Sequence, residues 1–188
     1  MITLTSTISI SEFDGIDSLI SDIAHSDGST ALEKLYERTR DAVYGYAFSI
    51  LKNSHDAEDV LHDCYISICQ SAGGYVSDGK PMAWIFTITR NLCLSKLRSH
   101  SRLSDVPQED WEQYLESNER VSVEDRIVLE HCLRDLADDE REILILHILF
   151  GLKHREIAEL QDRPLSTILS KYHRALRKMR ALLSEEDR

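Results

Sequence analysis

The chain has 188 residues, of which 42% are hydrophobic and 29% charged, and its formal net charge is −11. This length and apolar content suit one ordinary domain or two small ones, and exclude collagen-like and low-complexity chains. The acidic balance argues against indiscriminate binding to nucleic acid, because duplex DNA is bound through cations that neutralise its phosphates. No apolar run reaches the roughly 20 residues that cross a bilayer, and no signal-peptide pattern opens the chain, so we expect a cytoplasmic protein without membrane insertion.

Charge is unevenly distributed along the chain. The segments 1–98, 99–121 and 122–163 are all net acidic, whereas 164–183 holds five basic residues and no acid. Such a protein is repelled by DNA in general, but it can place one basic element against DNA when a partner holds the complex together.

Apolar residues recur at intervals of three and four almost throughout, which predicts an all-α chain; only residues 2–10 alternate like a strand. A helix is expected at 31–51, and residues 16–24 form either a short extra helix or the first helix of the same domain. A further helix begins after the N-cap candidates Asn53 and Ser54, with carboxylates in its first turn.

Glycines mark a loop at 71–80 before the next helix. Pro81 suits the first position of that helix, which is expected to end near Arg98. From residue 99 to 121 the periodicity fails and acidic residues dominate. The sequence therefore predicts a helical domain at 1–98, a linker at 99–121 and a second helical domain at 122–188.

The second domain has the outline of a helix-turn-helix. Its expected elements are helices at 122–136 and 138–150, the latter capped by Asp138 and ended by Gly151, then a short helix at 153–161, a break at 162–164 and a long amphipathic helix to Leu183. A short helix, a tight turn and a long basic helix are typical of DNA-binding proteins.

The last helix separates into an apolar stripe and a basic face. The stripe comprises Leu165, Ile168, Leu169, Tyr172, Ala175, Leu176, Met179 and either Leu182 or Leu183. The opposite face comprises Ser166, Thr167, Ser170, Lys171, Arg174, Arg177 and Lys178. In a recognition helix the N-terminal residues reach base edges while later cations meet phosphates, although a solvated charged face is the simpler alternative.

A different strip lies opposite the apolar face of the helix that follows Asn53. It comprises Asp59, His62, Asp63 and Ile66, at helical spacing. This pattern is either a solvated face or a docking patch in which the carboxylates orient a basic partner and Ile66 supplies apolar contact.

The four cysteines, at 64, 69, 93 and 132, include no C-x-x-C pair and fall among apolar helical positions. We expect reduced core thiols, with no metal site and no cofactor. An enzyme that used His62 with Cys64, or His131 with Cys132, is the weakest alternative, because no set of these residues has ligand spacing.

Several stretches resemble bacterial extracytoplasmic-function (ECF) sigma factors. LYERTRDAVYGYAFSILKNSHDAEDVLHDCYISI and GKPMAWIFTITRNLCLSKLRS resemble the promoter-melting region 2, and LADDEREILILHILFGLKHREIAELQDRPLSTILSKYHRALRKMR resembles region 4. The motifs D-A-E-D at 56–59, A-W at 83–84, R-N at 90–91 and E-I-A-E at 156–159 occur in the family's order. The resemblance implies a promoter-specificity subunit of RNA polymerase, with no catalytic residues of its own.

The resemblance also implies sites on both domains. By resemblance, the contact with the clamp helices of the polymerase β′ subunit is assigned to Asp56, Glu58, Asp59, His62, Asp63 and Ile66. The start-proximal promoter element would meet Gly74, Tyr75, Ser77, Asp78, Lys80, Trp84, Thr87, Arg90, Asn91, Lys96 and Arg98, with one flipped base captured by the loop.

Region 4 would meet the distal promoter element through the basic face of the last helix, and its other surfaces would hold the β flap. An anti-sigma factor is a further partner that the family suggests. The family's turn carries Gly, whereas this chain has Asp162, which must adopt a conformation that Gly accepts more easily. A free-standing helix-turn-helix regulator that binds DNA without polymerase is the runner-up hypothesis.

Overall fold

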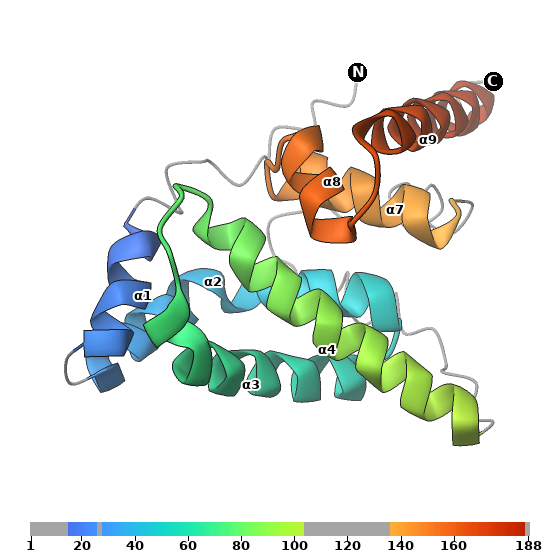
Figure 1. Ribbon diagram of the computed structural model, residues 1–188. Helices are drawn as coiled ribbons and strands as arrows, with labels where there is room; N and C mark the ends of the chain where they lie inside the picture. The colour runs from blue at the N-terminus through green and yellow to red at the C-terminus, as the bar shows by residue number, and fades with distance from the viewer. Residues whose placement is uncertain (1–14, 26–27, 104–135, 187–188) are drawn as a thin grey trace. The chain divides into compact units, whose positions relative to one another are not determined.

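The computed structural model in Figure 1 describes residues 15–25, 28–103 and 136–186. All regular elements in these ranges are helices, which confirms the predicted all-α class. None of these helices is both long and apolar enough to cross a membrane. The strand-like pattern at 2–10, the linker beyond residue 103 and all but the last residue of the helix expected at 122–136 lie outside the described residues.

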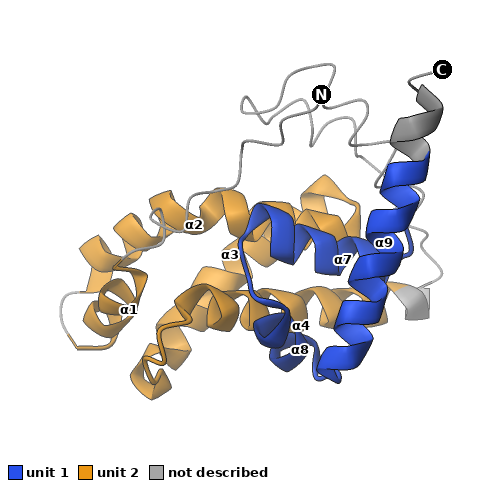
Figure 2. Cartoon of the chain, turned by 90° about the horizontal axis from the view of Figure 1, so that it is seen from above, with its two compact units in different colours: residues 1–8, 110–188 blue, residues 9–109 orange. Residues whose placement is uncertain are grey.

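The chain divides into two compact units, drawn in different colours in Figure 2. Residues 9–109 make up the first, which we call the N-terminal unit. Residues 110–188 make up the other, together with residues 1–8, and we call it the C-terminal unit. The linker predicted at 99–121 therefore overlaps the boundary between the two units.

In its described residues, the N-terminal unit is a bundle of four helices and one short 3-10 turn. Its elements are α1 (Ile16–His25), α2 (Gly28–Leu51), α3 (Ser54–Ser71), η2 (Ala72–Gly74) and α4 (Pro81–Leu103). Helices α2, α3 and α4 pack on one another, and α1 packs against α2 and η2. The helix expected at 16–24 is therefore present as α1, and it packs within this unit.

Local chemistry explains where α3 begins. Asn53 has an extended backbone, and its side-chain oxygen accepts a 3.0 Å hydrogen bond from the Asp56 N–H, as the predicted N-cap requires. This cap satisfies an N–H that the first helical turn leaves without a partner.

Helix α4 runs past its predicted end near Arg98 and continues to Leu103, so the first residues of the expected linker are helical. No Gly or Pro interrupts residues 99–103, and His100 Nδ1 lies 3.5 Å from the Asp56 carboxylate of α3. Polar composition alone does not end a helix when its side chains find partners on a neighbouring one.

The cysteines only partly meet the expectation of core thiols. Cys64 and Cys93 are buried, and burial raises the pKa of Cys64 to about 11. Cys69 is exposed, so its assignment to the core was wrong. Its neighbour Ile68 is fully buried, and one residue turns an α-helix by about 100°, which carries Cys69 out of the core. Cys132 lies outside the described residues.

The C-terminal unit contains α7 (Asp138–Leu144), the π-turn η3 (Ile145–Leu149), α8 (His154–Gln161) and α9 (Leu165–Glu186). Gly151 ends the first helical segment with φ 71°, as expected. The cap of α7 is Ala137 rather than Asp138, because Glu140 reaches back and accepts a 3.4 Å hydrogen bond from the Ala137 N–H. Glu140 is itself buried, with 2% of its surface exposed.

The turn between α8 and α9 adopts the conformation that the sequence demanded. Asp162 lies in the left-handed region, with φ 51° and ψ 50°. Ile157, Ile168 and Ala175 are buried where α8 and α9 meet the rest of the unit. Leu165 is 37% exposed, however, so it does not belong to the predicted buried stripe. It is the first residue of α9 and has no preceding turn to pack against.

Candidate functional site

An exposed strip runs along α3 as the sequence predicted. Its members Asp59, His62, Asp63 and Ile66 all face solvent, as does the neighbouring Glu58, and Ile66 is 56% exposed. Ile66 is one of three large exposed hydrophobic side chains in the described residues, so the strip combines carboxylates with an apolar contact.

Asp56 does not share that surface. Its side chain is 13% exposed, and its carboxylate lies 3.0 Å from Lys96 Nζ of α4. Lys96 also donates a 2.6 Å hydrogen bond to Asp59, and this bond and the lysine charge lower the pKa of Asp59. Lys96, which the resemblance assigned to promoter phosphates, therefore bridges two carboxylates of α3.

The loop between η2 and α4 is attached to two other helices. The ring of Tyr75 packs on Trp84 of α4, with centroids 4.7 Å apart, and its hydroxyl donates a 2.5 Å hydrogen bond to Asp17 Oδ1 of α1. Ser77 Oγ donates to the same oxygen at 2.8 Å. Val76, between them, is 80% exposed. The loop thus exposes the apolar side chain of Val76 between two residues whose side chains are bonded to α1.

Further on, Gly74 is exposed and Asp78 accepts a 3.0 Å hydrogen bond from the Lys80 N–H. Along α4, most of the predicted DNA-binding residues recur at intervals of three, four and seven, on one face. They are Trp84, Thr87, Asn91 and Arg98, and Lys80 directly precedes the helix at the same spacing. Arg90 lies off this face by helical spacing.

On α9 the predicted basic face divides in two. Ser166, Ser170, Arg174 and Arg177 are exposed, whereas Thr167, Lys171 and Lys178 are half-buried. His173 and Arg180, which the sequence analysis did not select, are exposed as well. Their spacing from Ser170 and Arg177 is the signal that would have found them.

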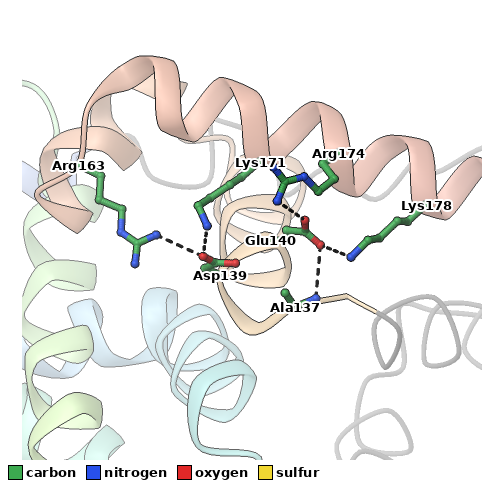
Figure 3. Close-up of polar contacts among 7 residues, drawn as sticks. All are labelled: Ala137, Asp139, Glu140, Arg163, Lys171, Arg174 and Lys178. Atoms are coloured by element: carbon green, nitrogen blue, oxygen red, sulfur yellow. Dashed lines mark hydrogen bonds and ion pairs between the residues drawn. The ribbon is translucent and has the colours of Figure 1, made fainter.

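Figure 3 shows why the lysines of α9 are covered: they point toward two carboxylates of α7. Asp139 Oδ2 accepts from Lys171 Nζ and, at 3.3 Å, from Arg163. Glu140 accepts from Lys178 Nζ at 2.6 Å and lies 3.6 Å from Arg174. Although burial acts to raise it, the pKa of Asp139 is lowered by Lys171 and Arg163. Sequence reasoning missed both acids, because their partners lie more than twenty residues away.

A cluster of aromatic rings joins η3, α8 and α9. The ring of His154 lies 4.1 Å from that of His147 and 4.5 Å from that of Tyr172, measured between centroids. Its Nε2 atom is buried and has no hydrogen-bond partner in the described part of the chain. Burial, and then the charges of His147 and His173, lower the pKa of His154.

Together these features define a class of protein. A helix-turn-helix with a basic second helix is a means of approaching duplex DNA, and an acidic strip with one exposed apolar residue is a means of docking on another protein. An all-α chain that carries both on separate units belongs to the DNA-binding transcription proteins.

Comparison with known families identifies the family of transcription proteins to which this chain belongs. The family model for Sigma-70 region 2 matches residues 35–103, and that for Sigma-70, region 4 matches residues 126–179, together well over half of the chain. The chain belongs to the sigma-70 family, in its ECF group. It is thus a sigma factor, the subunit that binds core RNA polymerase, recognises and melts promoter DNA and starts transcription. Nothing in these matches favours a free-standing regulator.

Similar proteins span both units. The ECF RNA polymerase sigma factor SigK of Mycobacterium sp. strain KMS is 26% identical over 175 residues, covering 89% of this chain and 90% of that protein. SigK of Mycobacterium ulcerans is 24% identical over 177 residues, covering 90% and 94%.

Among solved structures, the fold resembles that of the sigma factor RpoE from Bartonella quintana in complex with the anti-sigma factor NepR. The TM-score is 0.64 at 22% identity, over 81% of this chain and 96% of that one. CnrH in complex with the cytosolic domain of CnrY gives 0.65 at 21% identity, over 92% and 99%.

Proposed function

We propose that three separate surfaces of this sigma factor carry polymerase docking, capture of the start-proximal promoter element and contact with the distal element. The observation that carries the proposal is the exposed strip on α3, because it joins carboxylates to Ile66, which is 56% exposed. An exposed isoleucine beside acids offers a partner that has a basic, partly apolar face both an apolar contact and orienting charges.

The docking surface consists of Glu58, Asp59, His62, Asp63 and Ile66, and its partner is the pair of clamp helices of the β′ subunit. Asp56 supports this surface from beneath, because it is buried and shares Lys96 with Asp59. Lys96 orients the Asp59 carboxylate through a 2.6 Å hydrogen bond.

The loop around Tyr75 to Asp78 takes the flipped base of the start-proximal element. The exposed face of α4 then supports the opened strand through Trp84, Thr87 and Asn91, with Arg90 and Arg98 as cations close by. A ring such as that of Trp84 offers a stacking surface, and cations near the strand neutralise phosphates.

The distal element meets α9. Ser166, Ser170, Arg174 and Arg177 are exposed and available to bases and phosphates, and His173 and Arg180 extend the same surface. Lys171 reaches DNA on exchanging its partly exposed partner Asp139 of α7, whereas Lys178 contacts phosphates while it stays paired with the buried Glu140. Thr167 lies at the edge of this surface.

Two further partners complete the proposal. The remaining surface of the C-terminal unit holds the β flap, and an anti-sigma factor regulates the chain. The similar sigma factor RpoE forms a complex with such a factor, NepR, which supports the second point. The chain acts without catalysis of its own, in the cytoplasm, where bacterial RNA polymerase meets its promoters.

Docking is tested by two charge changes on the strip. Ile66→Asp and Asp59→Arg should each weaken binding to core polymerase by about tenfold or more, as loss of an interface anchor does. The measurement is a titration of labelled core enzyme with each variant, with helical content checked by circular dichroism. Val76→Asp is the matched control, because it places the same charge at an exposed apolar position of the loop. Wild-type affinity for both strip variants would contradict the assignment.

A further inference from the structure

Asp17 is not part of any surface described above, yet it contacts the loop that takes the flipped base. We propose that Asp17 is a positioning residue which, through Tyr75 and Ser77, sets the base preference of the start-proximal element toward bases that carry an exocyclic amino group. The inference rests on the proposed function of the loop.

The geometry joins segments far apart in the chain. A single oxygen, Asp17 Oδ1, accepts hydrogen bonds from Tyr75 OH at 2.5 Å and from Ser77 Oγ at 2.8 Å. The two donors lie on either side of Val76, whose side chain is 80% exposed. Asp17 therefore fastens the loop to α1 on both sides of its tip.

Tyr75 has a second restraint, since its ring packs on Trp84 with centroids 4.7 Å apart. The tyrosine thus bridges α1 and α4. Burial, and then the neighbouring carboxylate of Asp17, raise the pKa of the Tyr75 hydroxyl well above its ordinary value.

These bonds decide what the loop can offer to a base. A hydroxyl group has one proton, and in both Tyr75 and Ser77 that proton is given to Asp17, so each oxygen retains only acceptor capacity. A flipped base is recognised on its Watson–Crick edge, where adenine, cytosine and guanine each present an exocyclic amino group and thymine presents keto oxygens and no amino group. Two acceptors favour the amino group over the keto oxygen.

The contact is separable from the packing of α1. Ile16 and Ile20 are fully buried and hold this helix in the unit, and Ser18 Oγ donates a 2.7 Å hydrogen bond to the Gly15 carbonyl. Loss of the Asp17 carboxylate should therefore leave α1 folded and change mainly the loop.

The test compares Asp17→Ala with Asp17→Asn in holoenzyme reconstituted from the full chain. Open-complex formation is measured on promoters that carry each of the four bases at each position of the start-proximal element. At one position, Asp17→Ala should reduce the preference for adenine or cytosine over thymine by about five- to tenfold, the worth of one or two hydrogen bonds. Asp17→Asn keeps an acceptor oxygen at the same place and should retain the preference. Glu37→Ala, which removes an exposed acid of α2, is the matched control and should change nothing.

A second readout follows the loop itself, without polymerase. The sequence has two tryptophans, so Trp111→Phe leaves Trp84 as the only one. In that background Asp17→Ala should shift the Trp84 emission, because the Tyr75 ring is no longer held against it, and Asp17→Asn should restore it. Unchanged emission with Asp17→Ala would overturn the positioning role.

Failure of the inference differs from failure of the loop assignment. An exchange of residues 75–78 is measured in parallel on the same promoters. If that exchange alters the ranking of bases and Asp17→Ala lowers all promoters equally, the role of Asp17 is overturned and the loop keeps its function. If neither variant alters the ranking, the proposed function of the loop is overturned as well.

Discussion

The acidic strip of α3 and the basic face of α9 both hold part of their charge in ion pairs inside their own unit, but at different depths. Asp59 of the strip is 70% exposed and pairs with Lys96. Glu140, which pairs with Lys178 and lies near Arg174, is 2% exposed. The first pair lies at a surface that water reaches, and the second has its carboxylate buried under α9.

This difference in depth separates two uses of an ion pair. An exposed pair contributes little stability and can exchange its partner at little cost, which suits a docking surface. A buried carboxylate is costly to leave without its partners, so it belongs to the structure of the unit. The same sequence signal, a charged residue on a helix face, thus has different consequences in the two units.

The largest effect should follow from Glu140→Ala. This change removes the carboxylate that bonds Lys178 and the Ala137 N–H, and it should lower the free energy of unfolding of the C-terminal unit by about 1–3 kcal/mol. Urea unfolding of the full chain, with hydrogen exchange followed on α7 and α9, measures it. Asp59→Ala is the control, and its effect on unfolding should stay well below that. Equal effects of the two variants would remove the distinction between the pairs.

Asp139→Asn should act on DNA binding instead. Asp139 holds Lys171 and Arg163, and its side chain is 30% exposed. Without its charge these cations are available to phosphates, so the holoenzyme should bind promoter DNA about three- to tenfold more tightly at low salt, with a salt dependence steeper by about one phosphate contact. Fluorescence anisotropy over a salt series gives both quantities. Unchanged affinity and slope would mean that neither cation reaches DNA.

Mild acidification should affect the C-terminal unit through His154, with the smallest of the three effects. Its folded-state pKa lies below the ordinary value of 6.5, so the unfolded chain binds the proton first. The stability contributed by neutral His154 is complete above about pH 7 and is lost as the pH falls through 6.5 toward the lower folded-state pKa. The difference between the free energies of unfolding at neutral and at mildly acidic pH should be smaller in the His154→Gln variant.

Urea unfolding at about pH 7.5 and 5.5, on either side of the ordinary histidine value, measures this effect. His25→Gln is the control, because this exposed histidine lies on α1 of the other unit. If His25→Gln reduces the pH dependence of the free energy of unfolding as much as His154→Gln does, His154 is not its source. The exposed Asp59–Lys96 pair should respond only in stronger acid, since the pKa of Asp59 is itself lowered.

Much of the fold could be predicted because its signals are local. The Asn53 cap, the start of α4 at Pro81, the end at Gly151 and the left-handed Asp162 each depend on a few neighbouring residues. Helical periodicity likewise identified the strip on α3, since exposure along one helix follows from spacing. The family motifs, taken in order, identified the sigma factor.

The sequence by itself therefore determined where the described helices form, the order of the two units and which helix faces carry acidic or basic residues. Only the tertiary structure decided which charges are satisfied inside the protein: Asp17 with Tyr75 and Ser77, Asp56 with Lys96, and Asp139 with Lys171. Each of these contacts joins residues 32 to 60 positions apart. Helical spacing says which side chains share a face, but the partner across the interface is set by how two helices pack, and no local pattern records that.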